Sequence, residues 1–171
     1  MPRLFFALWP DDKTRARLAA VADQLPQRLG KRVPAQKLHL TLVFLGQVDD
    51  TVRDGLIEDA GAIASPPFAI EFTHSGWWPR AEVAWLAPDN IPPELPPLVE
   101  RLQQIARARQ IEVDGRPYAP HLTVARKLRR RPPSLAFAPI RWEIREFCLV
   151  ESSAGPAGSE YRILRSWPLT P

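Results

Sequence analysis

Cysteine and histidine are scarce in this chain of 171 residues, and each scarcity excludes a class of protein. A single cysteine cannot form an internal disulfide, which excludes a disulfide-stapled framework. Cys148 lies within an apolar run, so we interpret it as a core residue in a reduced compartment. The three histidines and one cysteine show no Cys-x-x-Cys or His-x-x-x-His spacing, so the sequence predicts neither a metal site nor a cofactor.

Long hydrophobic runs are also missing. No apolar run reaches the length of a membrane span, and residues 1–9 are too short for a signal peptide before the acidic pair Asp11 and Asp12. We therefore expect a cytoplasmic protein with no membrane partner. The sequence contains no phosphate-binding glycine loop and no Gly-x-Ser-x-Gly elbow. The excess of 23 Lys and Arg over 19 Asp and Glu permits an anionic substrate without requiring one.

The 20 prolines divide the chain into short elements. Helical spacing of apolar residues predicts helices after Pro10, after Asp49 and over residues 95–106. We expect an aromatic turn at residues 77–80, a hairpin loop at 155–158, and strands at 3–9, 38–45, 68–72, 83–86, 122–127, 142–150 and 161–167. This order predicts an α+β fold with helices over antiparallel sheets, in one domain of residues 1–171.

A His-x-Thr pattern with apolar neighbours occurs twice in the chain, at His39/Thr41 and at His121/Thr123. Alternate side chains of a strand share a face, so each motif is expected to present one imidazole and one hydroxyl on the same side. One such motif alone would suit a hydrogen-bonded histidine at a strand edge. Because two of only three histidines carry the pattern, we interpret the pair as functional.

Two imidazoles and two hydroxyls suit in-line displacement at phosphorus. One imidazole can take a proton from water while the other protonates the departing oxygen, and the two must lie on opposite sides of the phosphate. Hydroxyls such as those of Thr41 and Thr123 can donate to the non-bridging oxygens, where charge gathers in the transition state. Both proton transfers are then supplied without a metal.

Two further features lie outside the motifs. The basic run of residues 126–131 directly follows the second motif, and it is either a solvated loop or a contact for the phosphate backbone of a nucleic acid. The third histidine, His74, lacks the motif and is interpreted as a turn or structural residue.

The chain resembles the two-histidine phosphoesterases, and within them the RNA 2′,3′-cyclic phosphodiesterases, also called 2′-5′ RNA ligases. The matching segments run almost from end to end and lie at residues 3–8, 38–46, 83–86, 116–126 and 151–169. The resemblance implies a bilobal α+β fold, with antiparallel sheets lining a central cleft, helices outside and one motif from each lobe. It also implies that the protein hydrolyses a terminal RNA 2′,3′-cyclic phosphate, with RNA ends, among them tRNA fragments, as partners. We expect a monomer.

The resemblance also suggests a role for each site residue. His39 is expected to be the proton donor and His121 the proton acceptor, while Thr41 and Thr123 hold the phosphate. Arg126 is expected to contact phosphate or stack on a base. Phe6 matches an aromatic position near the nucleotide, although plain core packing is the slightly favoured interpretation of this residue. Tyr118 stands where phenylalanine is commoner, which leaves open whether its hydroxyl enters the site.

Three alternatives remain at this stage. The first is 2′-5′ ligation of tRNA halves, the reverse reaction at the same site. The second is hydrolysis of another cyclic phosphate or of a 2′-5′ oligonucleotide. The third is an RNA-end binding module without catalysis, which the two histidines disfavour because arginine binds phosphate better than a neutral imidazole does.

Overall fold

The computed structural model describes all 171 residues, and every strand pairing in it is antiparallel. The strands are β1 (Arg3–Leu8), β2 (Lys31–Arg32), β3 (Leu40–Gln47), β4 (Phe68–Phe72), β5 (His74–Trp78), β6 (Val83–Ala87), β7 (Leu122–Arg126), β8 (Ile140–Ile144), β9 (Glu146–Gly155) and β10 (Gly158–Pro168). The α-helices are α1 (Asp12–Ala22), α2 (Asp50–Gly61) and α3 (Leu95–Ala108), and short 3₁₀ turns lie at Gln27–Leu29 and Ala35–Lys37. The expected α+β fold is therefore confirmed.

The helices begin where the sequence predicts. Asp11 caps α1 by accepting a 2.8 Å hydrogen bond from the amide of Thr14, and Asp49 caps α2 in the same way from Val52. Helix α3 has proline in its first turn and buries one side of its surface, including Leu98. None of the helices is long and apolar enough to cross a membrane.

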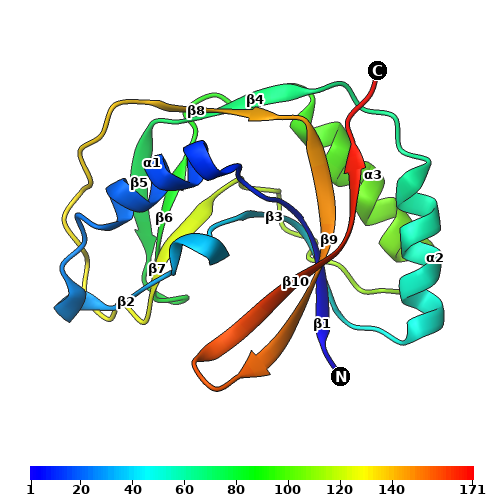
Figure 1. Ribbon diagram of the computed structural model, residues 1–171, viewed down its shortest axis with the longest axis horizontal. Helices are drawn as coiled ribbons and strands as arrows, with labels where there is room; N and C mark the ends of the chain where they lie inside the picture. Colours follow the sequence, from blue (N-terminus) through cyan, green and yellow to red (C-terminus); the bar gives the residue numbers. More distant parts are fainter.

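One large sheet carries eight of the strands in the order β10-β9-β1-β3-β7-β6-β5, with β2 added beside β7. Figure 1 shows its two wings diverging from the centre, with β1, β9 and β10 on one side and β5, β6 and β7 on the other. A second sheet of β4 and β8 closes the top of the same view. Strand β3 therefore joins the two wings, and Leu40 and Leu122 are the only backbone-paired residues of β3 and β7.

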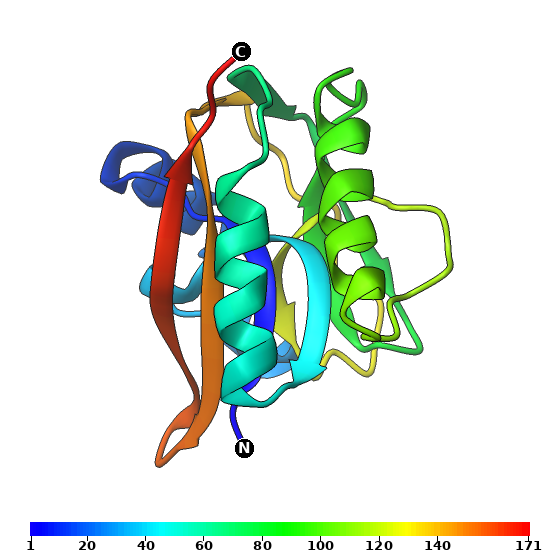
Figure 2. The same cartoon turned by 90° about the vertical axis from the view of Figure 1, so that its right-hand side faces the viewer.

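The helices cover the outside of these wings. Helices α2 and α3 lie side by side on one flank (Figure 2), where α3 contacts β3 and α2 contacts β10. Helix α1 packs against β7 and β8 on the other wing. A core of 36 buried residues, from Leu4 to Leu169, fills the space between sheets and helices. A separate small cluster of Phe5, Ala7, Cys148 and Val150 lies on the other face of β1 and β9, so Cys148 is confirmed as a buried residue.

Three expectations about the strands were wrong. Residues 142–150 do not form one strand, because the chain leaves the β4–β8 sheet at Arg145 and enters the large sheet as β9. Trp77 and Trp78 lie in β5, paired with β6, so the turn between the strands comes after them. His39 lies one residue before β3, although the strand was expected to begin at Leu38.

Candidate active site

The two His-x-Thr motifs lie side by side at the centre of the large sheet. Leu40 pairs with Leu122, and both side chains are 0% exposed. In antiparallel pairing the residues that flank this pair face each other, so His39 lies beside Thr123 and Thr41 beside His121. All four flanking residues are partly exposed, whereas the residues that alternate with them are buried. The structure therefore brings both imidazoles and both hydroxyls to one face of the sheet.

Each imidazole is held by the same kind of hydrogen bond, from its Nδ1 to the backbone carbonyl oxygen two residues earlier in the chain. Nδ1 of His39 lies 2.7 Å from the carbonyl oxygen of Lys37, and Nδ1 of His121 lies 2.9 Å from that of Ala119. A carbonyl oxygen can only accept, so Nδ1 carries the hydrogen in both histidines. This fixes the tautomer and leaves Nε2 of each neutral ring as a proton acceptor.

Aromatic rings enclose His39. Trp9 stacks on the imidazole with the two ring planes 2° apart and the centroids 4.9 Å apart. Phe5 lies 5.1 Å away in a tilted arrangement, and Tyr161 of β10 meets the ring edge-on at 5.2 Å. Tyr161 also contacts both Phe5 and Trp9, and the centroid of Phe5 lies 6.1 Å from that of the exposed Phe44. His39 is thus fixed in an apolar setting that admits little water.

His121 has a different aromatic neighbour on the other wing. Trp78 meets its ring edge-on, with the centroids 4.4 Å apart. Trp78 in turn contacts Trp85, which is paired with Thr123 across β6 and β7. Each catalytic candidate therefore has its own aromatic support, from β1 and β10 for His39 and from β5 and β6 for His121.

Burial lowers the pKa of both imidazoles. For His39 the loss of hydration is the largest cause, repulsion from Arg126 and from a protonated His121 adds to it, and together they bring the pKa to about 4. For His121 burial is again the main cause of a lowered pKa, with a second contribution from Arg126. The hydrogen bonds to the two carbonyl oxygens act in the opposite direction and are outweighed. Both rings are consequently neutral at pH 7 in the free protein.

Arg126 ends β7 and is exposed. The pairing of β6 with β7 shifts by one residue between Ala84–Ala125 and Trp85–Thr123, which marks a bulge at Val124. In regular alternation Arg126 would share the core-facing side of the strand with the buried Leu122. The bulge reverses this alternation, which accounts for the influence of Arg126 on the pKa of both histidines. Arg126 is therefore close enough to both histidines for its charge to lower their pKa values.

The hydroxyl of Tyr118 does not enter the site. It donates a 2.9 Å hydrogen bond to the carbonyl oxygen of Thr41 and so ties the approach to the second motif to the backbone of the first. Burial raises the pKa of this phenol well above its ordinary value. Tyr118 is thus a bridge between the two motifs, and a role in binding substrate directly is not supported by its contacts.

The prediction that Phe6 lies near the nucleotide was wrong. Its side chain is 0% exposed and packs against Phe147 and Trp167 in the main core, so it cannot touch a nucleotide. The residue of β1 that faces His39 is Phe5, and Trp9 continues the same face beyond the strand. Sequence reasoning missed both, although the two-residue period of a strand places them opposite Phe6 and Leu8.

His74 lies outside the site. It starts β5, is largely exposed, and approaches Asp89 with Nδ1 2.9 Å from a carboxylate oxygen. No group of three or more His, Cys, Asp and Glu side chains is placed to hold a metal ion.

The antiparallel α+β fold and the doubled histidine–threonine site together define a phosphoesterase of the two-histidine class. The chain belongs to the 2′-5′ RNA ligase superfamily, whose family model matches residues 9–156. It is 32% identical to the RNA 2′,3′-cyclic phosphodiesterase of Escherichia coli, over 98% of this chain and 97% of that one. The RNA 2′,3′-cyclic phosphodiesterase of Thermus thermophilus is 28% identical, over 98% and 90% of the two chains.

Solved structures agree with this assignment. E. coli LigT complexed with 3′-AMP superposes with a TM-score of 0.92 at 32% identity, covering 100% of both chains. TT0787 of T. thermophilus superposes with a TM-score of 0.85 at 27% identity, over 98% of this chain and 97% of that one. The protein is accordingly an enzyme of the cyclic phosphodiesterase family.

Proposed function

We propose that the protein hydrolyses the 2′,3′-cyclic phosphate at the end of an RNA to a 2′-phosphomonoester, without a metal ion. The observation that supports this proposal is the pairing of Leu40 with Leu122, from which two imidazoles and two hydroxyls are expected on one face of the sheet. The names of the curated relatives support RNA as the substrate, and the 3′-AMP complex of LigT supports binding of a nucleotide.

Each histidine has a distinct task in this reaction. The Nε2 atom of His121 takes a proton from a water molecule, whose oxygen forms a new bond to phosphorus. The bond from phosphorus to the 3′ oxygen breaks, and Nε2 of His39 protonates that oxygen as it leaves. The products are a free 3′ hydroxyl and a 2′ phosphate. The assignment of His39 as donor and His121 as acceptor follows the family pattern.

The remaining site residues bind the phosphate. The hydroxyls of Thr41 and Thr123 donate to the two non-bridging oxygens, and the guanidinium of Arg126 balances their negative charge. Tyr118 acts through Thr41, because its hydrogen bond holds the strand that carries this hydroxyl.

Substrate binding is needed to protonate the acid. In the free protein the pKa of His39 is about 4, so this ring holds a proton only rarely at pH 7. A phosphodiester anion placed between the imidazoles favours the charged form of its neighbour and raises that pKa. The bound phosphate therefore favours one proton on the pair of imidazoles, and in the productive form His39 carries this proton while His121 is neutral.

A synthetic RNA ending in a 2′,3′-cyclic phosphate, incubated with the protein in EDTA, tests the proposal. We expect a 2′-phosphate product, identified by mass and by its resistance to an enzyme that removes only 3′ phosphates. The variants His39→Ala and His121→Ala are each expected to lose on the order of 10²–10⁴ in rate, as general acid–base groups do. His74→Ala is the matched control, because His74 lies outside the site, beside Asp89.

Two results would defeat the proposal. One is the absence of turnover on the cyclic end at any pH. The other is a requirement for a divalent cation, shown by activity that EDTA abolishes and the added cation restores.

The second candidate is 2′-5′ ligation, which the family description names and in which a 5′ hydroxyl replaces water as the nucleophile while the 3′ oxygen again leaves. Water at about 55 M favours hydrolysis, so ligation needs a substrate whose second end displaces water from the site. Incubating tRNA halves that carry a cyclic phosphate and a 5′ hydroxyl, and probing the product for a 2′-5′ junction, distinguishes the two activities.

A further inference from the structure

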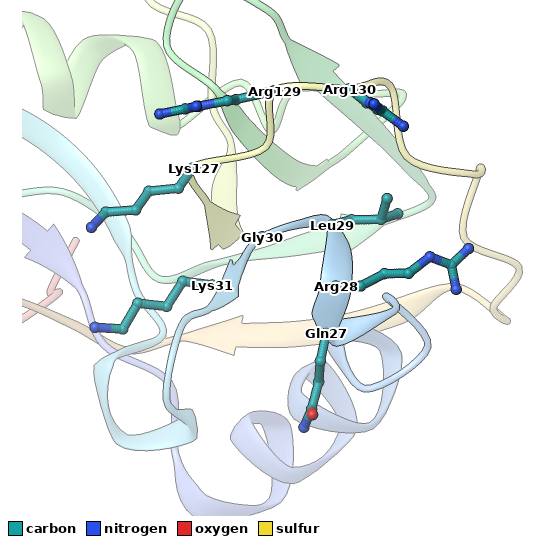
Figure 3. Close-up of a pocket in the computed structure, with 8 residues that line it drawn as sticks. All are labelled: Gln27, Arg28, Leu29, Gly30, Lys31, Lys127, Arg129 and Arg130. Atoms are coloured by element: carbon teal, nitrogen blue, oxygen red, sulfur yellow. The ribbon is translucent and has the colours of Figure 1, made fainter.

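A basic pocket lies next to the second motif but outside the catalytic residues. It has a volume of about 450 Å³ and lies between the 3₁₀ turn before β2 and the chain that follows β7. Five of its lining residues are cationic, and no acidic residue lines it. The five are Arg28, Lys31, Lys127, Arg129 and Arg130 (Figure 3).

The positive charge of this pocket is not neutralised within the protein. None of the five cations has a carboxylate oxygen within 4.0 Å of its charged nitrogen atoms. Elsewhere arginines do find carboxylates, as Arg109 does with Asp59 at 2.8 Å. Five like charges around one hollow repel one another, so the pocket favours an anionic ligand.

Close packing fixes the two walls. A Cβ atom on Gly30 would lie 2.7 Å from the carbonyl oxygen of Arg126 and 2.8 Å from the side chain of Leu128, so only glycine allows this approach. Leu128 is 1% exposed, and its amide donates to the carbonyl oxygen of Glu82 at 2.9 Å. The indole of Trp77 donates to the carbonyl oxygen of Leu128 at 3.1 Å. The basic loop is therefore anchored on both sides of Lys127.

Lys127 itself lies in the left-handed region, with φ of 59°. This conformation is uncommon for a residue other than glycine, and it turns the chain out of β7 immediately after Arg126. Arg131, at the far end of the basic run, lies over the ring of Trp77 at 5.8 Å and does not line the pocket.

The pocket lies beyond the end of β7, the strand that directly follows His121. Lys31 pairs with Arg126, which lies five residues beyond His121, or about 16 Å along an extended strand. The ammonium of Lys31 is 3.9 Å from the position of a Cβ on Gly158, in the hairpin whose Tyr161 contacts His39. Figure 3 shows Lys31, Lys127 and Arg129 extending to one side of the pocket and Arg28 and Arg130 to the other. An extended polyanion crossing the pocket would meet both groups in turn.

We propose that this pocket binds backbone phosphates of the RNA on the 5′ side of its cyclic end. The enzyme then prefers RNA oligonucleotides over cyclic mononucleotides, because a mononucleotide in the catalytic site does not reach the pocket. This inference rests on the proposed function for the position of the RNA end. Affinity in the pocket comes from charge and is independent of base sequence.

The test compares two substrates in one triple variant, Lys31→Gln/Lys127→Gln/Arg129→Gln. With a ten-nucleotide RNA ending in a 2′,3′-cyclic phosphate, we expect KM to rise on the order of 10- to 100-fold. With 2′,3′-cyclic AMP, KM and kcat are expected to stay within about twofold. Fluorescence anisotropy measures the binding of a labelled RNA with a 2′-phosphate end. In the triple variant, the slope of log affinity against log salt concentration is expected to be smaller in magnitude by roughly 2, at about 0.7 per cation removed.

The matched control removes the same charge elsewhere, in Lys13→Gln/Arg101→Gln/Arg145→Gln, all of which are exposed residues outside the pocket. Equal weakening of RNA binding in this control, or equal effects on both substrates, would overturn the proposal. So would an unchanged salt slope in a pocket variant that keeps its melting temperature. If neither substrate is hydrolysed, the proposed function fails, and the anisotropy measurement still decides whether the pocket binds RNA.

Discussion

Leu40 and Leu122, the middle residues of the two motifs, pair with each other and are the only backbone-paired residues of β3 and β7. Both side chains are completely buried, so core packing fixes the position of this pair, and the flanking side chains lie on the partly exposed face of the sheet. The geometry of the site thus depends on one residue pair and on the groups that hold the chain on either side of it. The predictions that follow address those groups.

Replacing Tyr118 by phenylalanine removes the hydrogen bond to the carbonyl oxygen of Thr41 and leaves that oxygen without its partner. We expect the free energy of unfolding to fall by about 1–3 kcal/mol, the usual cost of an unsatisfied buried polar group. Urea denaturation measures this change. A lowered kcat at unchanged KM would add that the bond positions Thr41, whereas unchanged stability and unchanged kcat would show that the bridge has no role.

The pH dependence of kcat/KM follows from the lowered pKa of both imidazoles. The productive form of the free enzyme carries one proton on the two imidazoles. Above both pKa values, the fraction of enzyme in this form falls about tenfold for each pH unit. Since the pKa of His39 is about 4 and that of His121 is below its ordinary 6.5, kcat/KM should peak between these values and decline from pH 7 to pH 8. The profile of kcat should extend to higher pH, because bound phosphate stabilises the protonated ring. A kcat/KM that is flat or rising up to pH 8 would contradict this account.

Arg126 has two effects that substitution can separate. The change Arg126→Ala removes a positive charge that lowers the pKa of both histidines, so the optimum of kcat/KM should move to higher pH. It also removes a charge-assisted contact to phosphate, for which we expect a loss of roughly 10- to 100-fold in kcat/KM. The control Arg126→Lys keeps the charge and should keep the optimum. An optimum that is the same in the alanine and lysine variants would rule out the electrostatic role.

Trp9 keeps water from His39 by stacking on its ring. In Trp9→Ala the imidazole becomes hydrated, so its pKa should rise from about 4 towards the ordinary 6.5, since burial is the largest cause of the shift. Titration of the imidazole carbon-bound protons by NMR measures this, with His121 and His74 of the same sample as internal references. A His39 resonance that titrates as in the wild type would show that Trp9 does not control its hydration.

Much of the fold could be predicted because its signals are local. The aspartates at positions 11 and 49 mark helix starts, and the alternation around each motif indicates which side chains share a face. The proposed catalytic pair could also be chosen without the structure, because two of three histidines repeat one pattern. These features depend on residues only a few positions apart.

What could not be predicted depends on contacts between distant segments. Phe5 and Phe6 are equally aromatic, and only the placement of β9 and β10 determines that Phe5 faces His39 and Phe6 the core. The hydroxyl of Tyr118 finds its partner 77 residues away. Likewise, Gly30 and Leu128 give no sign in the sequence that they are in contact. The basic run was visible from the start, whereas the pocket that it forms needed the second wall.

Cys148 provides a built-in measure of how rigidly this sheet is held. Its Sγ donates to the carbonyl oxygen of Ala7 on the neighbouring strand, and burial raises its pKa to about 12. The thiol is therefore neither accessible nor ionised while β1 and β9 stay paired, and a thiol reagent can reach it only when they part. Because the chain has no other cysteine, the rate at which a thiol reagent labels Cys148 would report how often β1 and β9, the strand pair that supports Phe5 and His39, separate. No engineered probe would be needed.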